Sequence, residues 1–156
     1  MQEGLKWIIA AVSLTGLIVC APAGSLAQDK GFGLGVIFGE PTGVSGKNWL
    51  DAKRAIDGGL SWSFQGEGDL HVHADMLWHF TDVIRSETRF PLYVGIGGRI
   101  RFHDPVLVGV RVPVGIAWWV DCAPLDVFLE IVPILDLTPS TDFEVNGGVG
   151  ARYFFQ

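Results

Sequence analysis

The chain has 156 residues, of which 49% are hydrophobic and 18% charged, and its net charge at pH 7 is −6. This length suits one domain, and no basic run or patch indicates a nucleic-acid partner. Beyond residue 27, no segment approaches the ~20 apolar residues of a membrane-spanning helix.

Residues 1–27 have the pattern of a secretory signal peptide. Lys6 supplies a positive charge, an apolar run follows, and small residues stand at the −3 and −1 positions before a cut after Ala27. We expect residues 28–156 to form one exported domain. The alternative is a lipoprotein site at Cys20, which is preceded by a bulky residue. A hydrophobic exported chain without a spanning helix is typical of a membrane β-barrel.

Eight segments of the exported part alternate between apolar and polar or glycine residues, which predicts strands with two different faces. In chain order they are Phe32–Gly39, Thr42–Trp49, Ala55–Phe64, Leu70–Phe80, Phe90–Phe102, Val106–Val120, Leu125–Leu137 and Phe143–Phe155. Short turns rich in Gly, Pro and Asp separate them, and this favours an up-and-down order.

The clearest of these strands is Leu70–Phe80. Its even positions are all apolar, while its odd positions hold three histidines, Asp75 and a single apolar residue, Leu77. Alternation alone does not decide which of the two faces lies inside.

The polar face carries too many charges for the core of a soluble binding barrel. Its charged residues are Asp57, Asp75, Arg99, Arg101, Arg111, Asp126, Glu130, Asp136, Glu144 and Arg152. Both signs are present, so these groups can pair inside a narrow eight-stranded barrel. The apolar face is continuous and would be an insoluble patch in water. We therefore expect the apolar face to meet lipid and a polar interior to be filled by side chains.

The aromatic residues support this assignment, because alternating strand directions place them at two levels. At the upper rim we expect Phe38, Trp62, Phe64, Phe102 and Phe143. At the lower rim we expect Phe32, Trp78, Phe80, Trp118, Tyr153 and Phe155. Two aromatic girdles are typical of membrane barrels.

Two prolines interrupt the long strands that fold back at residues 122–124. Pro113 and Pro133 both lack the N–H that a ladder requires, and counting from the turn places them one residue out of register. We expect a β-bulge or a locally opened ladder there. Inside the barrel we expect Arg111 to pair with Asp136, and Arg152 to pair with Glu130 or Asp126.

The chain resembles the small eight-stranded bacterial outer-membrane barrels, the OmpX-like and OmpA-membrane-domain class. The residues that carry this resemblance are Leu70–Phe80, Pro91–Phe102, Pro124–Asp142 and the terminal run Gly150–Phe155. It implies a location in the outer membrane, contact with outer-membrane lipid, assembly through the C-terminal strand and a monomeric state. Gln156 departs from the usual terminal aromatic.

The connections also differ from those of OmpX-like proteins, which carry long outer loops. Here the upper connections are short, and the longest connection, Thr81–Arg89, belongs to the presumed periplasmic side. This difference disfavours an adhesin.

Two groups of inward residues offer chemistry. Ser61 and Ser63 beside His71, His73 and Asp75 resemble a nucleophile and its base, with Ser63 expected near His71 and Ser61 near His73. His71 and His73, with His103 as a third ligand, resemble a metal site. Packing in a polar core accounts for the same residues, so we assign no catalytic, cofactor-binding or metal-binding residue.

The sequence therefore predicts an all-β, eight-stranded, antiparallel transmembrane barrel with a structural, non-enzymatic role in envelope integrity or surface interaction. The alternatives are a lipid-modifying outer-membrane enzyme that uses Ser and His, and a soluble periplasmic lipid-binding barrel.

Overall fold

The computed structural model describes residues 30–63, 68–84 and 89–155. The expected signal peptide with the alternative site at Cys20, and also Phe64 and Gln156, lie outside these residues. Within them, no helix is long and apolar enough to cross a membrane.

The described chain forms nine β-strands. They are β1 Phe32–Glu40, β2 Thr42–Trp49, β3 Arg54–Ser63, β4 Asp69–Phe80, β5 Leu92–Phe102, β6 Leu107–Arg111, β7 Val114–Trp119, β8 Leu125–Thr138 and β9 Asp142–Phe155. β6 and β7 are two halves of the predicted strand Val106–Val120, so the sheet has eight strand positions. The predicted all-β, eight-position order is confirmed.

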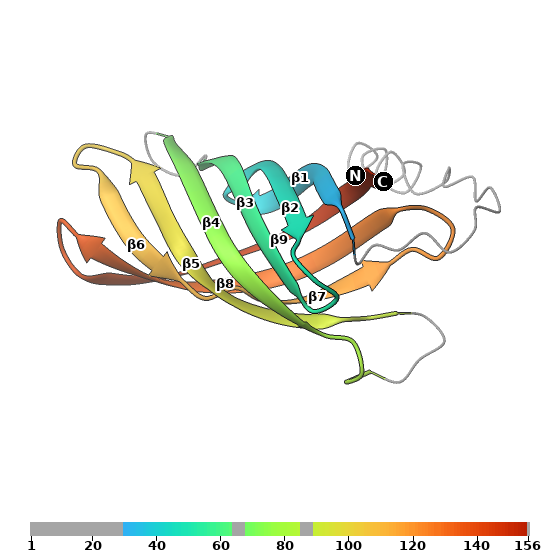
Figure 1. Ribbon diagram of the computed structural model, residues 1–156. Helices are drawn as coiled ribbons and strands as arrows, with labels where there is room; N and C mark the ends of the chain where they lie inside the picture. The colour runs from blue at the N-terminus through green and yellow to red at the C-terminus, as the bar shows by residue number, and fades with distance from the viewer. Residues whose placement is uncertain (1–29, 64–67, 85–88, 156) are drawn as a thin grey trace, which may run out of the picture.

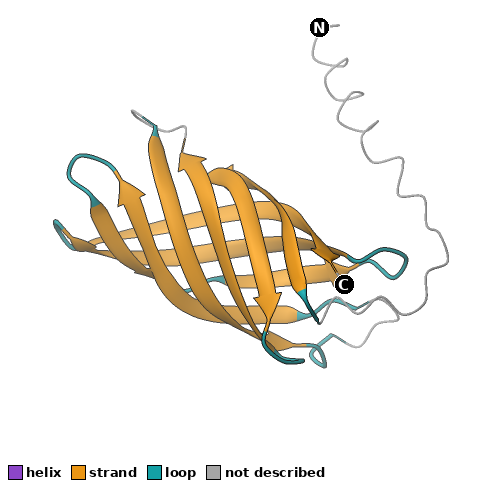
Figure 2. Cartoon of the chain, turned by 45° about the horizontal axis from the view of Figure 1, so that its top comes forward, coloured by secondary structure: helices purple, strands orange, loops and turns teal. Residues whose placement is uncertain are grey.

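The sheet closes into a barrel of antiparallel strands (Figures 1 and 2). Neighbours in the chain pair with each other, except β6 and β7, which lie end to end between β5 and β8. β1 pairs with β9 from Phe32 opposite Phe155 to Glu40 opposite Gly147. The β4–β5 pairing completes the ring. Every strand thus has a partner on both sides, which satisfies the backbone hydrogen bonds without a free edge.

The strand between β5 and β8 is interrupted at Val112 and Pro113, as expected. Val112 N–H still donates to the Pro133 carbonyl at 3.0 Å, and Gly95 N–H donates to the Pro113 carbonyl at 2.8 Å. Arg111 lies opposite Ile134 and Val114 opposite Ile131, so the register is unchanged across the prolines. The ladder therefore opens locally without an added residue.

The register shift of this wall lies elsewhere. It falls between Val108, which pairs with Thr138, and Gly109, which pairs with Asp136. Of the two expected forms, the structure has the opened ladder at the prolines, and the bulge lies at Val108 and Gly109. Each proline removes one donor while keeping an extended backbone, so no residue has to be added there.

The apolar face of the strands points outward, as predicted. Large hydrophobic side chains such as Leu34, Ile96 and Leu129 are about half exposed. The described aromatic residues of both predicted girdles are also exposed, from Phe38 and Phe143 at one rim to Phe32 and Phe155 at the other. This is the reverse of a soluble barrel.

The interior changes in character along the barrel axis. Charged and polar side chains fill the centre and the upper end, and fifteen buried polar or charged residues include Lys47, Arg99 and Arg152. The lower end instead holds an apolar cluster with Trp49, Trp119 and Phe154. The predicted polar, filled interior is thus closed on one side by aromatic rings.

Candidate functional site in the barrel interior

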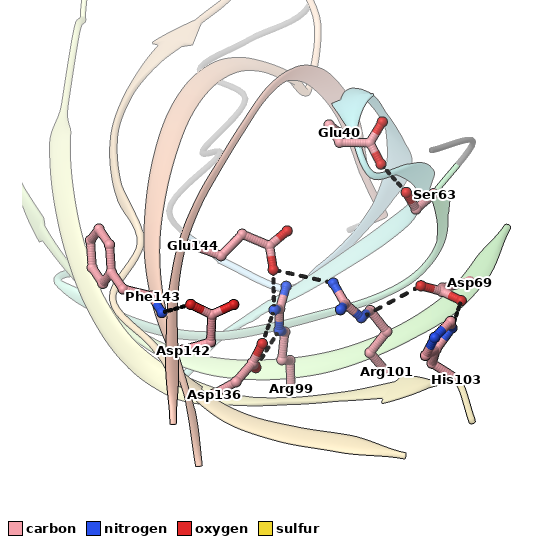
Figure 3. Close-up of polar contacts among 10 residues, drawn as sticks. All are labelled: Glu40, Ser63, Asp69, Arg99, Arg101, His103, Asp136, Asp142, Phe143 and Glu144. Atoms are coloured by element: carbon pink, nitrogen blue, oxygen red, sulfur yellow. Dashed lines mark hydrogen bonds and ion pairs between the residues drawn. The ribbon is translucent and has the colours of Figure 1, made fainter. Parts of the chain in front are cut away.

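The upper end of the barrel carries a network of opposite charges, which we name the rim network. It consists of Asp69, Arg99, Arg101, His103, Asp136 and Glu144, and Figure 3 shows it bridging several strands. Arg99 binds Asp136 with 2.6 Å between Nη2 and Oδ2, and the same nitrogen contacts Glu144. Arg101 lies 3.2 Å from Glu144 and 3.5 Å from Asp69.

A second group of charges, the central network, lies deeper in the barrel. It consists of Lys47, Asp57, Asp75, Tyr93, Arg111, Asp126, Glu130 and Arg152. Arg152 Nη2 lies 2.6 Å from Asp57 Oδ2, and Lys47 Nζ lies 3.2 Å from Asp126 Oδ2. These charges are buried, so their mutual pairing is needed to offset the cost of removing them from water.

The expected pairings of two arginines are wrong. Arg111 contacts Asp75 at 3.0 Å and Glu130 at 3.7 Å, while Asp136 is held by Arg99. Arg152 lies beside Asp126 in the strand register but binds Asp57 instead. Long side chains inside a narrow barrel reach across the lumen, so adjacency in the ladder does not decide their partners.

At the lower end of the lumen, aromatic side chains surround the ammonium group of Lys47. Lys47 Nζ lies 4.5 Å from the centre of the Trp49 ring and 2.9 Å from His79 Nε2. The Trp49 and Trp119 rings meet edge to face at 5.8 Å between centroids. The rings and the paired lysine fill this end of the lumen.

The structure does not assemble the expected Ser–His pairs. Ser61 lies opposite His71 and Ser63 opposite Asp69, so each serine pairs two residues away from its expected partner, because β3 ends and β4 begins one residue earlier than expected. Ser63 Oγ donates to Glu40. Ser61 Oγ and His71 Nε2 are buried and form no hydrogen bond with any described residue.

The expected metal-binding histidines do not converge. His103 lies at the rim, with Nδ1 2.8 Å from Asp69 Oδ1. His73 instead lies beside Asp57 and Asp75, and one candidate ligand atom from each of the three lies within 4.8 Å of the others. The metal site expected from the sequence included neither Asp57 nor Asp75, although both were placed on the inward face. Their positions opposite each other follow from the β3–β4 register.

These features define a class of protein: an eight-position antiparallel β-barrel with an apolar exterior and a lumen filled by ion pairs and aromatic rings. Among solved structures the chain is similar to the N-terminal β-barrel domain of Pseudomonas aeruginosa OprF, with a TM-score of 0.62 and 11% sequence identity. The match covers 80% of this chain and 96% of that one. No protein-family model and no curated protein matches the chain. At this identity the likeness concerns the fold.

Proposed function

We propose that the protein is a structural β-barrel of the bacterial outer membrane, without enzymatic activity. Its role would be in envelope integrity or in an interaction at the membrane surface. The observation that carries this proposal is the exposed apolar belt between two aromatic girdles.

The belt fits a lipid surface better than water. Ile96, Leu129 and Ile131 lie at mid-strand positions and are 52%, 56% and 59% exposed. Contiguous apolar surface of this kind does not stay soluble as a monomer. A closed sheet has no unpaired edge in the hydrocarbon region, which is the other requirement for a spanning structure.

The filled lumen favours a structural role over transport. The rim network lies across the upper end, and Lys47 with Trp49 and Trp119 fills the lower end. Eight strands enclose a space just wide enough for side chains. We therefore expect purified protein in planar bilayers to give no stable open-channel current.

The arrangement of Ser and His does not favour catalysis. A serine nucleophile needs a base within hydrogen-bond reach and a third group that orients the base. Ser61 Oγ hydrogen-bonds no described residue, and Ser63 Oγ donates to Glu40. We expect cells that express wild-type protein or the His73→Ala variant to contain lipid A of the same acylation as cells without it, by mass spectrometry. An acyl change that depends on His73 would overturn the non-enzyme assignment.

Cell fractionation tests the location. The full chain, expressed in a Gram-negative host, is expected in the outer-membrane fraction after an alkaline carbonate wash. The folded barrel should also migrate differently on gels with and without boiling. Recovery in the soluble periplasmic fraction would support the binding-barrel alternative and overturn the membrane assignment.

The C-terminal strand is the proposed contact with the assembly machinery. In β9, Tyr153 and Phe155 point outward and Arg152 and Phe154 point inward, which gives an aromatic, alternating end. Replacing Phe155 by Ser is expected to lower the amount of inserted barrel in cells. Refolding of the purified variant into detergent should be affected much less.

A further inference from the structure

Two aspartates of the central network face each other on neighbouring strands. Asp57 of β3 lies directly opposite Asp75 of β4, and like charges in such a pair repel. His73 lies two residues before Asp75, on the same face of β4. One nitrogen of its ring and one oxygen of each aspartate lie within 4.8 Å of one another. The barrel thus brings together two oxygen atoms and one nitrogen atom that could bind a metal ion.

The arginines of the network leave oxygens of these carboxylates unused. Asp57 and Asp75 are 4% and 3% exposed. Arg152 occupies Asp57 Oδ2, whereas Asp57 Oδ1 forms no hydrogen bond with a described residue. Arg111 Nε lies 3.0 Å from Asp75 Oδ2, and Asp75 Oδ1 has no hydrogen-bond partner among the described residues. A buried carboxylate oxygen without a partner is costly, so these two atoms are available to bind a ligand.

Glycines of β3 and β5, the strands on either side of β4, make room for the His73 and Asp75 side chains. A Cβ on Gly59 would lie 2.6 Å from His73 Cε1, and a Cβ on Gly97 would lie 2.1 Å from Asp75 Oδ1. A cavity of about 20 Å³ borders His73, Arg111 and Glu130 and extends to Glu40 at the rim end. This volume suits one water molecule. The surroundings therefore crowd the His73 and Asp75 side chains and leave space beside His73.

The charge balance of the central network also favours a cation. Its described members include four carboxylates, Asp57, Asp75, Asp126 and Glu130, but only three cationic side chains, Lys47, Arg111 and Arg152. With every group ionised, the network carries one negative charge in excess, and Asp57 and Asp75 are the two of its carboxylates that face each other on neighbouring strands.

We propose that Asp57, His73 and Asp75 bind a divalent transition-metal ion, with zinc as the best fit. One imidazole and two carboxylates are ligands that zinc accepts, and three protein ligands leave a fourth position for water. Bond lengths of about 2 Å place tetrahedral ligand atoms roughly 3.4 Å apart, so side-chain rotations of about 1 Å complete the site. Arg152 and Arg111 would orient the ligating carboxylates from outside. The ion would join β3 to β4 inside the barrel.

The test uses tag-free barrel, refolded in detergent and stripped with a chelator. Cobalt(II) is titrated as an optical probe, and zinc bound per chain is measured by elemental analysis after dialysis. We expect about one ion per folded chain, visible cobalt bands of tetrahedral intensity, and displacement of cobalt by zinc. His73→Gln and Asp75→Asn should each weaken binding at least tenfold.

His71→Gln is the matched control, because His71 lies two residues away on the same inward face. It should bind metal like the wild type. Gel migration without boiling shows whether each variant is folded. If His73→Gln or Asp75→Asn does not fold, Asp57→Asn is tested in its place. No uptake by folded wild-type protein would overturn the site, and so would equal uptake by the folded His73→Gln variant. The first result would mean that the aspartates share a proton instead. Neither result would affect the membrane location.

Discussion

Arg152 on β9 binds Asp57 on β3, with 2.6 Å between Nη2 and Oδ2, although β1 and β2 lie between these strands in the sheet. Its neighbour in the strand register, Asp126, binds Lys47 instead. The ion pair therefore joins opposite parts of the wall through the lumen, and the stability of the barrel depends on contacts that no single hairpin contains.

Replacing Arg152 by Met should destabilise the barrel strongly. The change leaves Asp57 buried without its cation, and breaking one partner of a buried pair costs about 3–5 kcal/mol. The free energy of unfolding is measured by urea titration of the protein refolded in lipid or detergent. The double variant Asp57→Asn/Arg152→Met should recover part of the loss, and failure to recover any would contradict the pairing.

An exposed ion pair provides the control for this experiment. Arg54 and Asp51 are paired at 2.6 Å in the β2–β3 turn, with side chains 57% and 39% exposed. The hydrogen bond from the backbone N–H of Lys53 is the main cause that holds the pKa of Asp51 below its usual value, and the hydrogen bond from the Arg54 side chain is the second. Because water screens this pair, we expect Arg54→Met to leave the free energy of unfolding unchanged within error.

An arginine placed on the outer face should destabilise the inserted barrel, and the effect should be largest at the middle of the bilayer. Val110 lies at mid-wall, opposite Gly98 and Leu135, whereas Val94 lies beside Trp78 of the lower girdle. We expect Val110→Arg to reduce the free energy of insertion and folding into bilayers by roughly 2–4 kcal/mol and Val94→Arg by less. Val106→Arg, just before β6, is the control. If the three arginine variants insert and fold with equal free energies, the assignment of the apolar face to the outside is wrong.

Two adjacent glycines of β5 should respond oppositely to alanine. A Cβ on Gly97 would lie 2.1 Å from the Ala74 carbonyl oxygen and 2.6 Å from Asp75 Cα, so backbone must move. A Cβ on Gly98 would meet nothing closer than 3.7 Å. We expect Gly97→Ala to destabilise by about 1–3 kcal/mol. Gly98→Ala should be neutral or stabilising by up to about 1 kcal/mol, since glycine weakens a strand. Urea unfolding measures both changes.

The two prolines should also differ. Pro133 faces outward and pairs with Val112 across the ladder. Such a pair normally exchanges two hydrogen bonds, but here only Val112 N–H donates. The Val112 carbonyl receives no bond from Pro133, which has no N–H. Restoring that bond with Pro133→Val should stabilise the barrel by about 0.5–1.5 kcal/mol. Pro113 is fully buried, with its Cγ packed against Gly95. Pro113→Val therefore gains a donor but loses packing, and we expect no net stabilisation. A larger gain at Pro113 than at Pro133 would contradict this account.

The sequence alone determined the strands and their faces. Alternation along Leu70–Phe80 has a period of two, and a strand of that period must present its two sets of side chains to opposite sides. One face of the strands carries the charges and the other is continuously apolar. This favours a barrel in which Val110 and the other apolar strand residues point outward. This reasoning uses only local geometry and burial costs, so it needed no knowledge of distant contacts.

The tertiary structure decided what happens inside the barrel. Closure of the ring sets which inward side chains share a level, and long side chains then choose partners across the lumen. The pairs Arg99–Asp136 and Arg152–Asp57 and the meeting of His73 with Asp57 depend on this closure. A sequence pattern shows which face of a strand a residue occupies but not its level along the barrel axis. A shift of the β3–β4 connection by one residue is enough to place Ser61 opposite His71 instead of His73. The candidate metal site could therefore be recognised only after the β3–β4 register was known.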